Sequence, residues 1–165
     1  MATRGLAHLL GRGAGKLKAE RIRAFLEALR IQDIPKDNRL LEQARVYSEK
    51  HRIDLEVRFH ADDGARRVVL VEAKFGHKLT KGQLSAYYTA RQGYDRDCRI
   101  VGLTSDAGGG MHHKQVANWS VVLWRDLWRR FEKNRPHEAD GQLAAFMAWL
   151  WQRIGGLSPT NSNSR

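Results

Sequence analysis

The sequence has a single cysteine, Cys98, among its 165 residues. One thiol cannot close an intramolecular disulfide or build a cysteine-rich zinc site. No apolar run approaches the roughly 18 residues that a transmembrane helix needs, and the N-terminal residues make a poor signal peptide. We therefore expect a cytoplasmic protein in a reducing environment, without membrane attachment.

Acidic residues are scarce relative to basic ones. Lysine and arginine number 29 against 18 aspartates and glutamates, which gives a formal net charge of +11 and a pI near 10.3. Such an excess favours a polyanionic partner, because each neutralised phosphate releases condensed counterions. Many small basic proteins bind no nucleic acid, so charge alone leaves both interpretations open.

The composition along the chain predicts one domain between two irregular ends. Residues 1–15 are rich in glycine and arginine and predict a flexible basic arm, whereas residues 157–165 predict a disordered polar tail. Residues 16–156 are long enough to bury a substantial core, and no linker divides them. We expect them to form a single domain.

Hydrophobic periodicity predicts an α/β fold for this domain. Apolar residues recur at helical spacing near both of its ends, and alternate at strand spacing in between. The segment 39–50 fits either a short helix or a strand. The expected helices cover residues 16–31, 80–92, 126–131 and 143–154, and the expected strands cover residues 53–59, 67–74, 99–104 and 120–124.

The second expected strand ends in a carboxylate and an ammonium group two positions apart. Glu72 and Lys74 flank Ala73, so both project from one face of a sheet. A hairpin turn centred at residues 63–64 would set Asp54 opposite Ala73, beside both charged groups, whereas a slip of one residue would move Asp54 to the other face. We expect the three charges to converge. An ordinary cross-strand ion pair, worth about 0–1 kcal/mol at a surface, is the alternative.

The order of these residues resembles the PD-(D/E)XK nuclease superfamily. The resemblance extends from about residue 40 to residue 133, and Ile53 stands where some members have proline. It implies a restriction-endonuclease-like fold, a single domain in which α-helices flank a mixed central β-sheet. The motifs are Asp54, Glu72-Ala-Lys74 and Gln83-Leu-Ser-Ala-Tyr87, the last similar to that of RecB-like members.

The resemblance implies a metal-dependent nuclease. Asp54, Glu72 and the carbonyl of Ala73 would bind Mg²⁺ or Mn²⁺, and Lys74 would be catalytic. The residue types suit the chemistry, because carboxylate oxygens bind hard cations, a bound cation activates water and a lysine can orient water or stabilise a charged transition state. The expected partner is nucleic acid, DNA rather than RNA, and a homodimer would suit a junction resolvase.

Three further candidates have competing interpretations. Gln83 follows Thr80 at the spacing of a helix capping box, which would explain it without catalysis. Tyr87 lies one helical turn later on the same face, where it would either contact the nucleic-acid backbone or fill the core. Many members of the superfamily add an acidic residue from a preceding helix. Glu42 is the first choice for that residue among Glu20, Glu27, Glu42 and Glu49.

Two functions without catalysis remain open from the sequence. A nucleic-acid-binding module could retain the nuclease fold and lack activity. An accessory subunit could instead dock through the last helix, where Trp149 lies off the apolar stripe. The adjacent His112 and His113 lack a third ligand at zinc spacing, so we expect no zinc site there.

Overall fold

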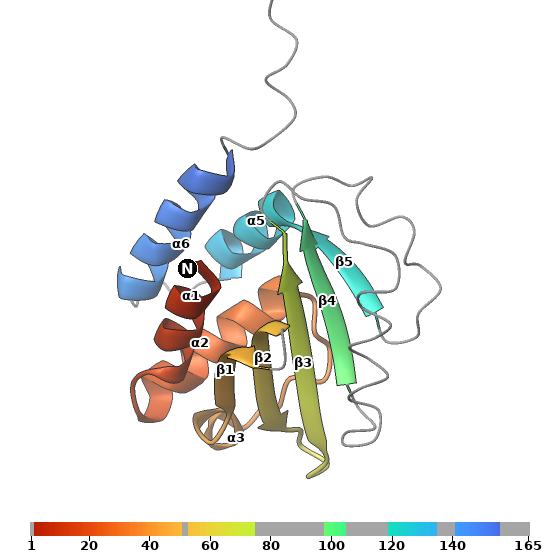
Figure 1. Ribbon diagram of the computed structural model, residues 1–165. Coiled ribbons are helices and arrows are strands. Elements are labelled where there is room, and N and C mark those ends of the chain that lie inside the picture. Colours follow the sequence, from red (N-terminus) through yellow and green to blue (C-terminus); the bar gives the residue numbers. More distant parts are fainter. Residues whose placement is uncertain (1, 51–52, 75–97, 105–118, 135–140, 156–165) are drawn as a thin grey trace, which may run out of the picture.

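A mixed five-stranded sheet forms the centre of the protein (Figure 1). The computed structural model describes residues 2–50, 53–74, 98–104, 119–134 and 141–155. Strands β1 to β3 pair in antiparallel fashion, whereas β3, β4 and β5 pair in parallel. In spatial order the strands are β1 (Arg45–Lys50), β2 (Ile53–His60), β3 (Arg66–Ala73), β4 (Cys98–Thr104) and β5 (Trp119–Leu123).

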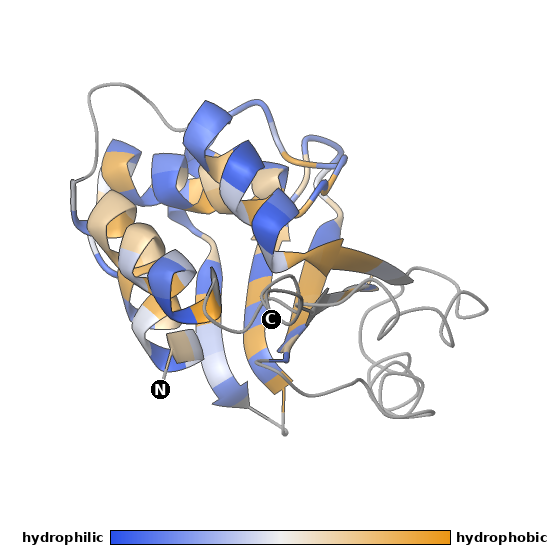
Figure 2. Cartoon of the chain, turned by 90° about the horizontal axis from the view of Figure 1, so that it is seen from above, coloured by the Kyte–Doolittle hydropathy of each residue, from blue (hydrophilic) through white to orange (hydrophobic). Residues whose placement is uncertain are grey.

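Four of the described helices gather on one side of this sheet (Figure 2). Helices α1, α2, α5 and α6 share one apolar cluster with the strands, and the short α3, which precedes β1 and contacts α2 and β2, adds Leu41 to it. Their bounds are α1 (Ala2–Gly11), α2 (Gly15–Ala28), α3 (Asn38–Glu42), α5 (Trp124–Asn134) and α6 (Gly141–Gly155).

The two faces of β3 are both buried. Val69 and Val71 point toward the helices and join their apolar cluster, so we call this the helical face. Val68, Leu70 and Glu72 alternate with them on the opposite face, where each is at most 4% exposed. Burial on both faces accounts for the continuous run of aliphatic residues in this strand, since neither face is left to water.

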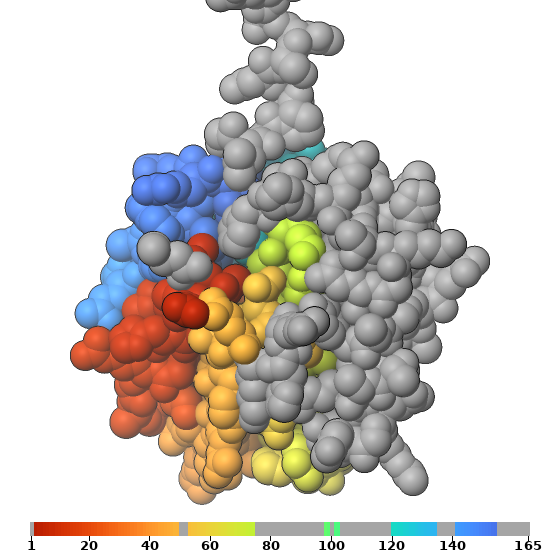
Figure 3. All heavy atoms as spheres, in the orientation of Figure 1, coloured from red at the N-terminus to blue at the C-terminus, as the bar shows by residue number. Residues whose placement is uncertain are grey.

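The N-terminal residues form a packed helix, which corrects the expectation of a flexible arm over residues 1–15. Helix α1 buries Leu6, Ala7 and Leu10 at helical spacing. It also lies close to α6 (Figure 3), and a Cβ on Gly5 would stand 2.7 Å from a ring carbon of Phe146. The glycine that suggested flexibility therefore permits a close helix contact.

The segment 39–50, which fits either a short helix or a strand in the sequence, contains one of each: most of α3 and the whole of β1. Asp37 caps α3 by accepting a hydrogen bond from the amide of Arg39 at 2.9 Å, and β1 follows within three residues. The other predicted helices and strands that fall within the described ranges are confirmed, including α2 and α6. The predicted helix 80–92 and the tail 157–165 lie outside the described residues.

The hairpin between β2 and β3 differs by one residue from the expected register. Its last pair is His60 with Arg66, and the turn between them centres on Asp63, whose carboxylate accepts from the Ala65 amide at 2.9 Å. Gly64 adopts a φ of 76°, which favours glycine. The register therefore runs as Leu55 with Val71 and Glu56 with Leu70.

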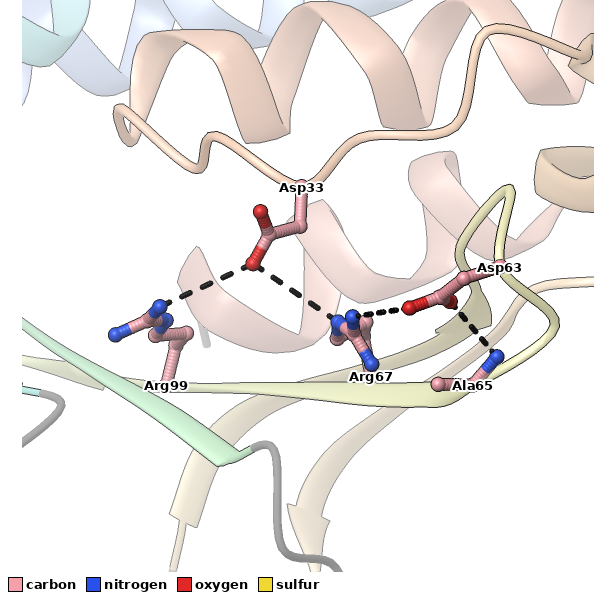
Figure 4. Close-up of polar contacts among 5 residues, drawn as sticks. All are labelled: Asp33, Asp63, Ala65, Arg67 and Arg99. Carbon is pink, nitrogen blue, oxygen red and sulfur yellow. Dashed lines mark hydrogen bonds and ion pairs between the residues drawn. The ribbon is translucent and has the colours of Figure 1, made fainter.

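An ionic network anchors this turn to the rest of the fold (Figure 4). Arg67 contacts Asp63 at 3.0 Å and Asp33 at 3.9 Å, and Asp33 also lies 3.8 Å from Arg99 of β4. The Ala65 amide, followed by the hydrogen bond from Arg67, lowers the pKa of Asp63. The network therefore joins the segment after α2 to β3 and β4, at the end of the sheet where β3 begins.

None of the helices in the described ranges has the length and apolar character needed to cross a membrane.

The packing of α1 gives a direct test. We expect Leu10→Ala to lower the free energy of unfolding by about 2–5 kcal/mol, because Leu10 is fully buried and truncation leaves a cavity. Leu17→Ala is the control, since Leu17 is 41% exposed at the start of α2, and should change stability by no more than about 0.5 kcal/mol. Urea unfolding measures both. Equal, small effects would show that α1 does not belong to the core.

Candidate active site

The charged pair Glu72 and Lys74 lies at the carboxyl end of β3. Lys74 Nζ donates to Glu72 Oε1 at 2.7 Å. The Glu72 side chain is 5% exposed and the Lys74 side chain 20%. A carboxylate buried to this degree requires a compensating charge or hydrogen bonds. Lys74 supplies both a positive charge and a hydrogen bond. The predicted placement of both groups on one face is therefore confirmed.

Asp54 is held at the same strand end by a backbone hydrogen bond. The amide of Ala73 donates to Asp54 Oδ2 at 2.7 Å. Extending the β2–β3 register by one residue sets Asp54 opposite Glu72 rather than Ala73. Since directly opposed residues of an antiparallel pair share a face, the corrected register is what places the two carboxylates together.

The backbone of Ala73 contributes a further polar group. In an extended strand the N–H and C=O of one residue point to the same neighbouring strand. The Ala73 amide points toward Asp54, so its carbonyl faces the β2 side as well. Two carboxylates, one carbonyl and one ammonium group therefore belong to a short stretch of two adjacent strands.

The alternative pairing of Asp54 with Lys74 is not what the structure shows. Within the described part of the chain, the ion pair of Lys74 is with Glu72, and Asp54 is bound by a backbone amide instead. Asp54 is therefore positioned by the backbone of Ala73, and the lysine is paired with Glu72 instead.

Two residues near this end were missed by sequence reasoning about the site. Glu56 follows Asp54 by two positions on the same face, is fully buried and forms an ion pair with Arg58. The alternating Asp-x-Glu of β2 was the available signal. Trp124, the first residue of α5, donates from Nε1 to the carbonyl of Lys74 at 3.0 Å. No local sequence signal connects these two residues, which are 50 positions apart.

The structure does not bring Glu42 to the carboxylates. Glu42 ends α3 just before β1, and the first residue of β1 pairs with Arg58, far along β2 from Asp54. Arg58 lies four positions from Asp54 along β2, and at about 3.3 Å per strand residue this separates the two positions by roughly 13 Å. The preference for Glu42 among the glutamates is therefore unsupported by its position.

Glu49 is the candidate glutamate nearest to Asp54 along the sheet. It lies between Ser48, which pairs with Leu55, and Lys50, which pairs with Ile53. Its φ of 52° is unusual for a residue with a side chain, and its carboxylate pairs with Arg4 of α1. The hydrogen bond from Arg4 lowers the pKa of Glu49.

The remaining candidates lie on α2 or outside the described residues. Glu20 lies on α2 and contacts Lys16 at 3.5 Å. Glu27 lies half-buried near the end of the same helix. Gln83 and Tyr87 lie outside the described residues, so their roles stay predictions.

The donors at the end of β3 fit a hard divalent cation. Mg²⁺ and Mn²⁺ prefer carboxylate and carbonyl oxygens and retain several waters, so two protein carboxylates suffice. Among the residues that the structure describes, no group of three or more His, Cys, Asp and Glu side chains is placed to hold a metal. The fit of Asp54, Glu72 and Ala73 rests on their oxygen donors, which suit a cation that keeps much of its water.

These features define a restriction-endonuclease-like protein, in which a mixed sheet carries two carboxylates and a lysine at the end of an inner strand. The sequence model of the PD-(D/E)XK nuclease superfamily matches residues 6–149. The chain belongs to this superfamily, whose members are generally nucleases and typically use divalent metals. Comparison with curated proteins and with solved structures gives no significant match.

The fit of these donors to a divalent cation gives a second test. We expect Glu72→Gln to weaken Mn²⁺ binding at least about tenfold in calorimetry, because a neutral amide replaces a charged ligand. Glu56→Gln is a matched control, a buried glutamate on the same face that is paired with Arg58, and should stay within about twofold of the wild type. If both variants bind Mn²⁺ like the wild type, Glu72 is not a ligand.

Proposed function

We propose that the protein is a Mg²⁺- or Mn²⁺-dependent nuclease that hydrolyses phosphodiester bonds of DNA. The observation that carries this proposal is the convergence of Asp54, Glu72 and Lys74 at one strand end, in a chain of the PD-(D/E)XK superfamily. An ion pair alone would explain Glu72 and Lys74. It would not explain why a second carboxylate is fixed by the neighbouring amide.

The two carboxylates and the Ala73 carbonyl would hold the cation. When bound, the cation neutralises charge on the phosphate and makes a bound water a better nucleophile. Asp54 reaches its place with one oxygen already engaged by the Ala73 amide. That bond restricts the side chain before substrate arrives, so less freedom is lost when the site is used.

Lys74 would act on the water or on the phosphate. Its ammonium group donates hydrogen bonds and stays beside Glu72 at 2.7 Å, so its four-carbon stem is held in one direction. From there it can orient the attacking water or donate to a phosphate oxygen as negative charge accumulates. The 20% exposure of its side chain leaves the group accessible to a substrate.

The charge of the chain supports a nucleic-acid substrate. A net charge of +11 favours association with a polyanion. Arg45 is exposed on β1 and pairs with Arg58 across the strands, which places it on the same sheet face as Glu72. Since β1 is the edge strand of the sheet, DNA bound at Asp54 and Glu72 could follow this edge toward Arg45.

Cleavage assays test the proposal directly. We expect Lys74→Met to lower kcat by about 10²–10⁴-fold on labelled DNA with Mn²⁺, because a positioned proton donor or acceptor contributes on that order. Lys133→Met, at an exposed lysine of α5, should cleave like the wild type. The substrates are single-stranded, double-stranded and four-way-junction DNA with matched RNAs, since the fold is compatible with each.

Two outcomes would contradict the proposal. Cleavage that persists unchanged in Lys74→Met would remove the lysine from the mechanism. Wild-type protein that retards DNA in a gel but cleaves none of the substrates would instead be a binding module with a nuclease fold. Light scattering of the same samples measures whether the protein is a homodimer, as a junction resolvase requires.

The proposed DNA path gives a fourth test. In the slowly cleaving Lys74→Met background, we expect Arg45→Ala to reduce the slope of log Kd against log salt by about 1, the loss of one phosphate contact. Arg153→Ala is the control, because Arg153 is exposed on α6, on the helical side, and lies over Trp149 at 5.2 Å. Equal slopes for the two variants would place the DNA elsewhere.

A further inference from the structure

The carbonyl of Lys74 is the first backbone acceptor beyond the paired part of β3. The β3–β4 ladder ends with Ala73 paired to Leu103, and no strand of the described ranges continues the pairing at Lys74. A backbone carbonyl at such a position needs another donor when it is shielded from water. The indole N–H of Trp124 supplies it at 3.0 Å.

Trp124 is fixed by its own surroundings. It is 3% exposed and belongs to the apolar cluster shared by the helices and the helical face of the sheet. An indole is a donor only, and a buried one usually finds an acceptor. The hydrogen bond therefore joins a residue that is rigidly packed in the core to the residue that carries the ammonium group of the site.

We propose that Trp124 is a positioning residue for Lys74. This inference rests on the proposed nuclease function, and it assigns a role in that function to a residue that touches no reacting atom. Holding the Lys74 carbonyl fixes the peptide unit that follows β3, and with it the direction in which the Lys74 side chain leaves the backbone. That direction carries Nζ to Glu72 Oε1.

The physical need for such a restraint follows from the nature of lysine. Its flexible stem can place the ammonium group in many positions, and misplacement of a catalytic group by about 1 Å can cost on the order of 10²-fold in rate. Two anchors act on Lys74, one at its carbonyl and one at Nζ. Glu72, which binds Nζ, is also a proposed metal ligand. The hydrogen bond from Trp124 to the carbonyl is therefore the restraint that does not depend on the cation.

The decisive comparison is Trp124→Phe against Trp128→Phe. Both remove an indole from α5, but Trp128 is partly buried, packs against the core and stacks on Trp151 with ring centroids 6.1 Å apart. We expect Trp124→Phe to lower kcat about 10- to 100-fold with KM unchanged, and Trp128→Phe to retain wild-type kcat. Replacing Trp124 by 3-benzothienylalanine, which keeps the bicyclic shape and lacks the N–H, should reproduce the effect with an unchanged Tm.

A measurement without catalysis separates this inference from the proposed function. Reductive ¹³C-methylation of the lysines yields an NMR signal for Lys74, identified by its loss in Lys74→Arg. We expect that signal to move toward those of exposed lysines in Trp124→Phe and to stay in place in Trp128→Phe. Wild-type protein that fails to cleave would overturn the proposed function, while the Lys74 signal would still decide the positioning role.

The inference is overturned by either of two results. In the first, kcat and the Lys74 signal of both Trp124 variants match the wild type. In the second, Trp124→Phe and Trp128→Phe lose activity equally and in proportion to their loss of Tm, which is the behaviour of general destabilisation.

Discussion

The burial of the Glu72 carboxylate at the end of β3 is the constraint on which the rest of the site depends. A charge in that position is costly unless it is paired and hydrogen-bonded, and Lys74 supplies a partner at 2.7 Å. The same strand end fixes Asp54 through the Ala73 amide and is itself held by Trp124. The contact with Lys74 makes the buried charge tolerable, and the other two contacts fix the groups beside it.

The sheet makes this arrangement rigid because β3 is enclosed on both faces. Its helical face packs into the cluster that contains α1, α2, α5 and α6, while the opposite face buries Val68 and Leu70 beside Glu72. Sites built on such strands hold their groups more precisely than sites on loops. The helix at the N-terminus contributes to this enclosure, and Gly5 permits its close contact with Phe146 of α6.

Much of the fold was predictable because its signals are local. The apolar stripe of α2 and the alternation in β2 and β3 arise from short-range periodicity, and the ordered Asp, Glu-x-Lys motif correctly indicated the superfamily. The expectation of a flexible arm over residues 1–15 is wrong because glycine content does not by itself imply flexibility, and Leu6 and Leu10 stand at helical spacing. The preference for Glu42 was wrong in position. Glu42 is near Asp54 in the sequence, but β1 and β2 run in opposite directions, so Glu42 precedes the end of β1 that pairs far from Asp54.

The sequence by itself determined that Glu72 and Lys74 share a face, because residues two apart in any strand do so. Only the tertiary structure decided which residue stands opposite Asp54, because a turn centred on Asp63 rather than one half-position later changes every cross-strand pair. It also decided the contact between Trp124 and the Lys74 carbonyl, which joins residues 50 positions apart. Such a contact depends on how a helix packs at the end of a sheet, and the residues that neighbour each partner in the sequence do not determine that packing.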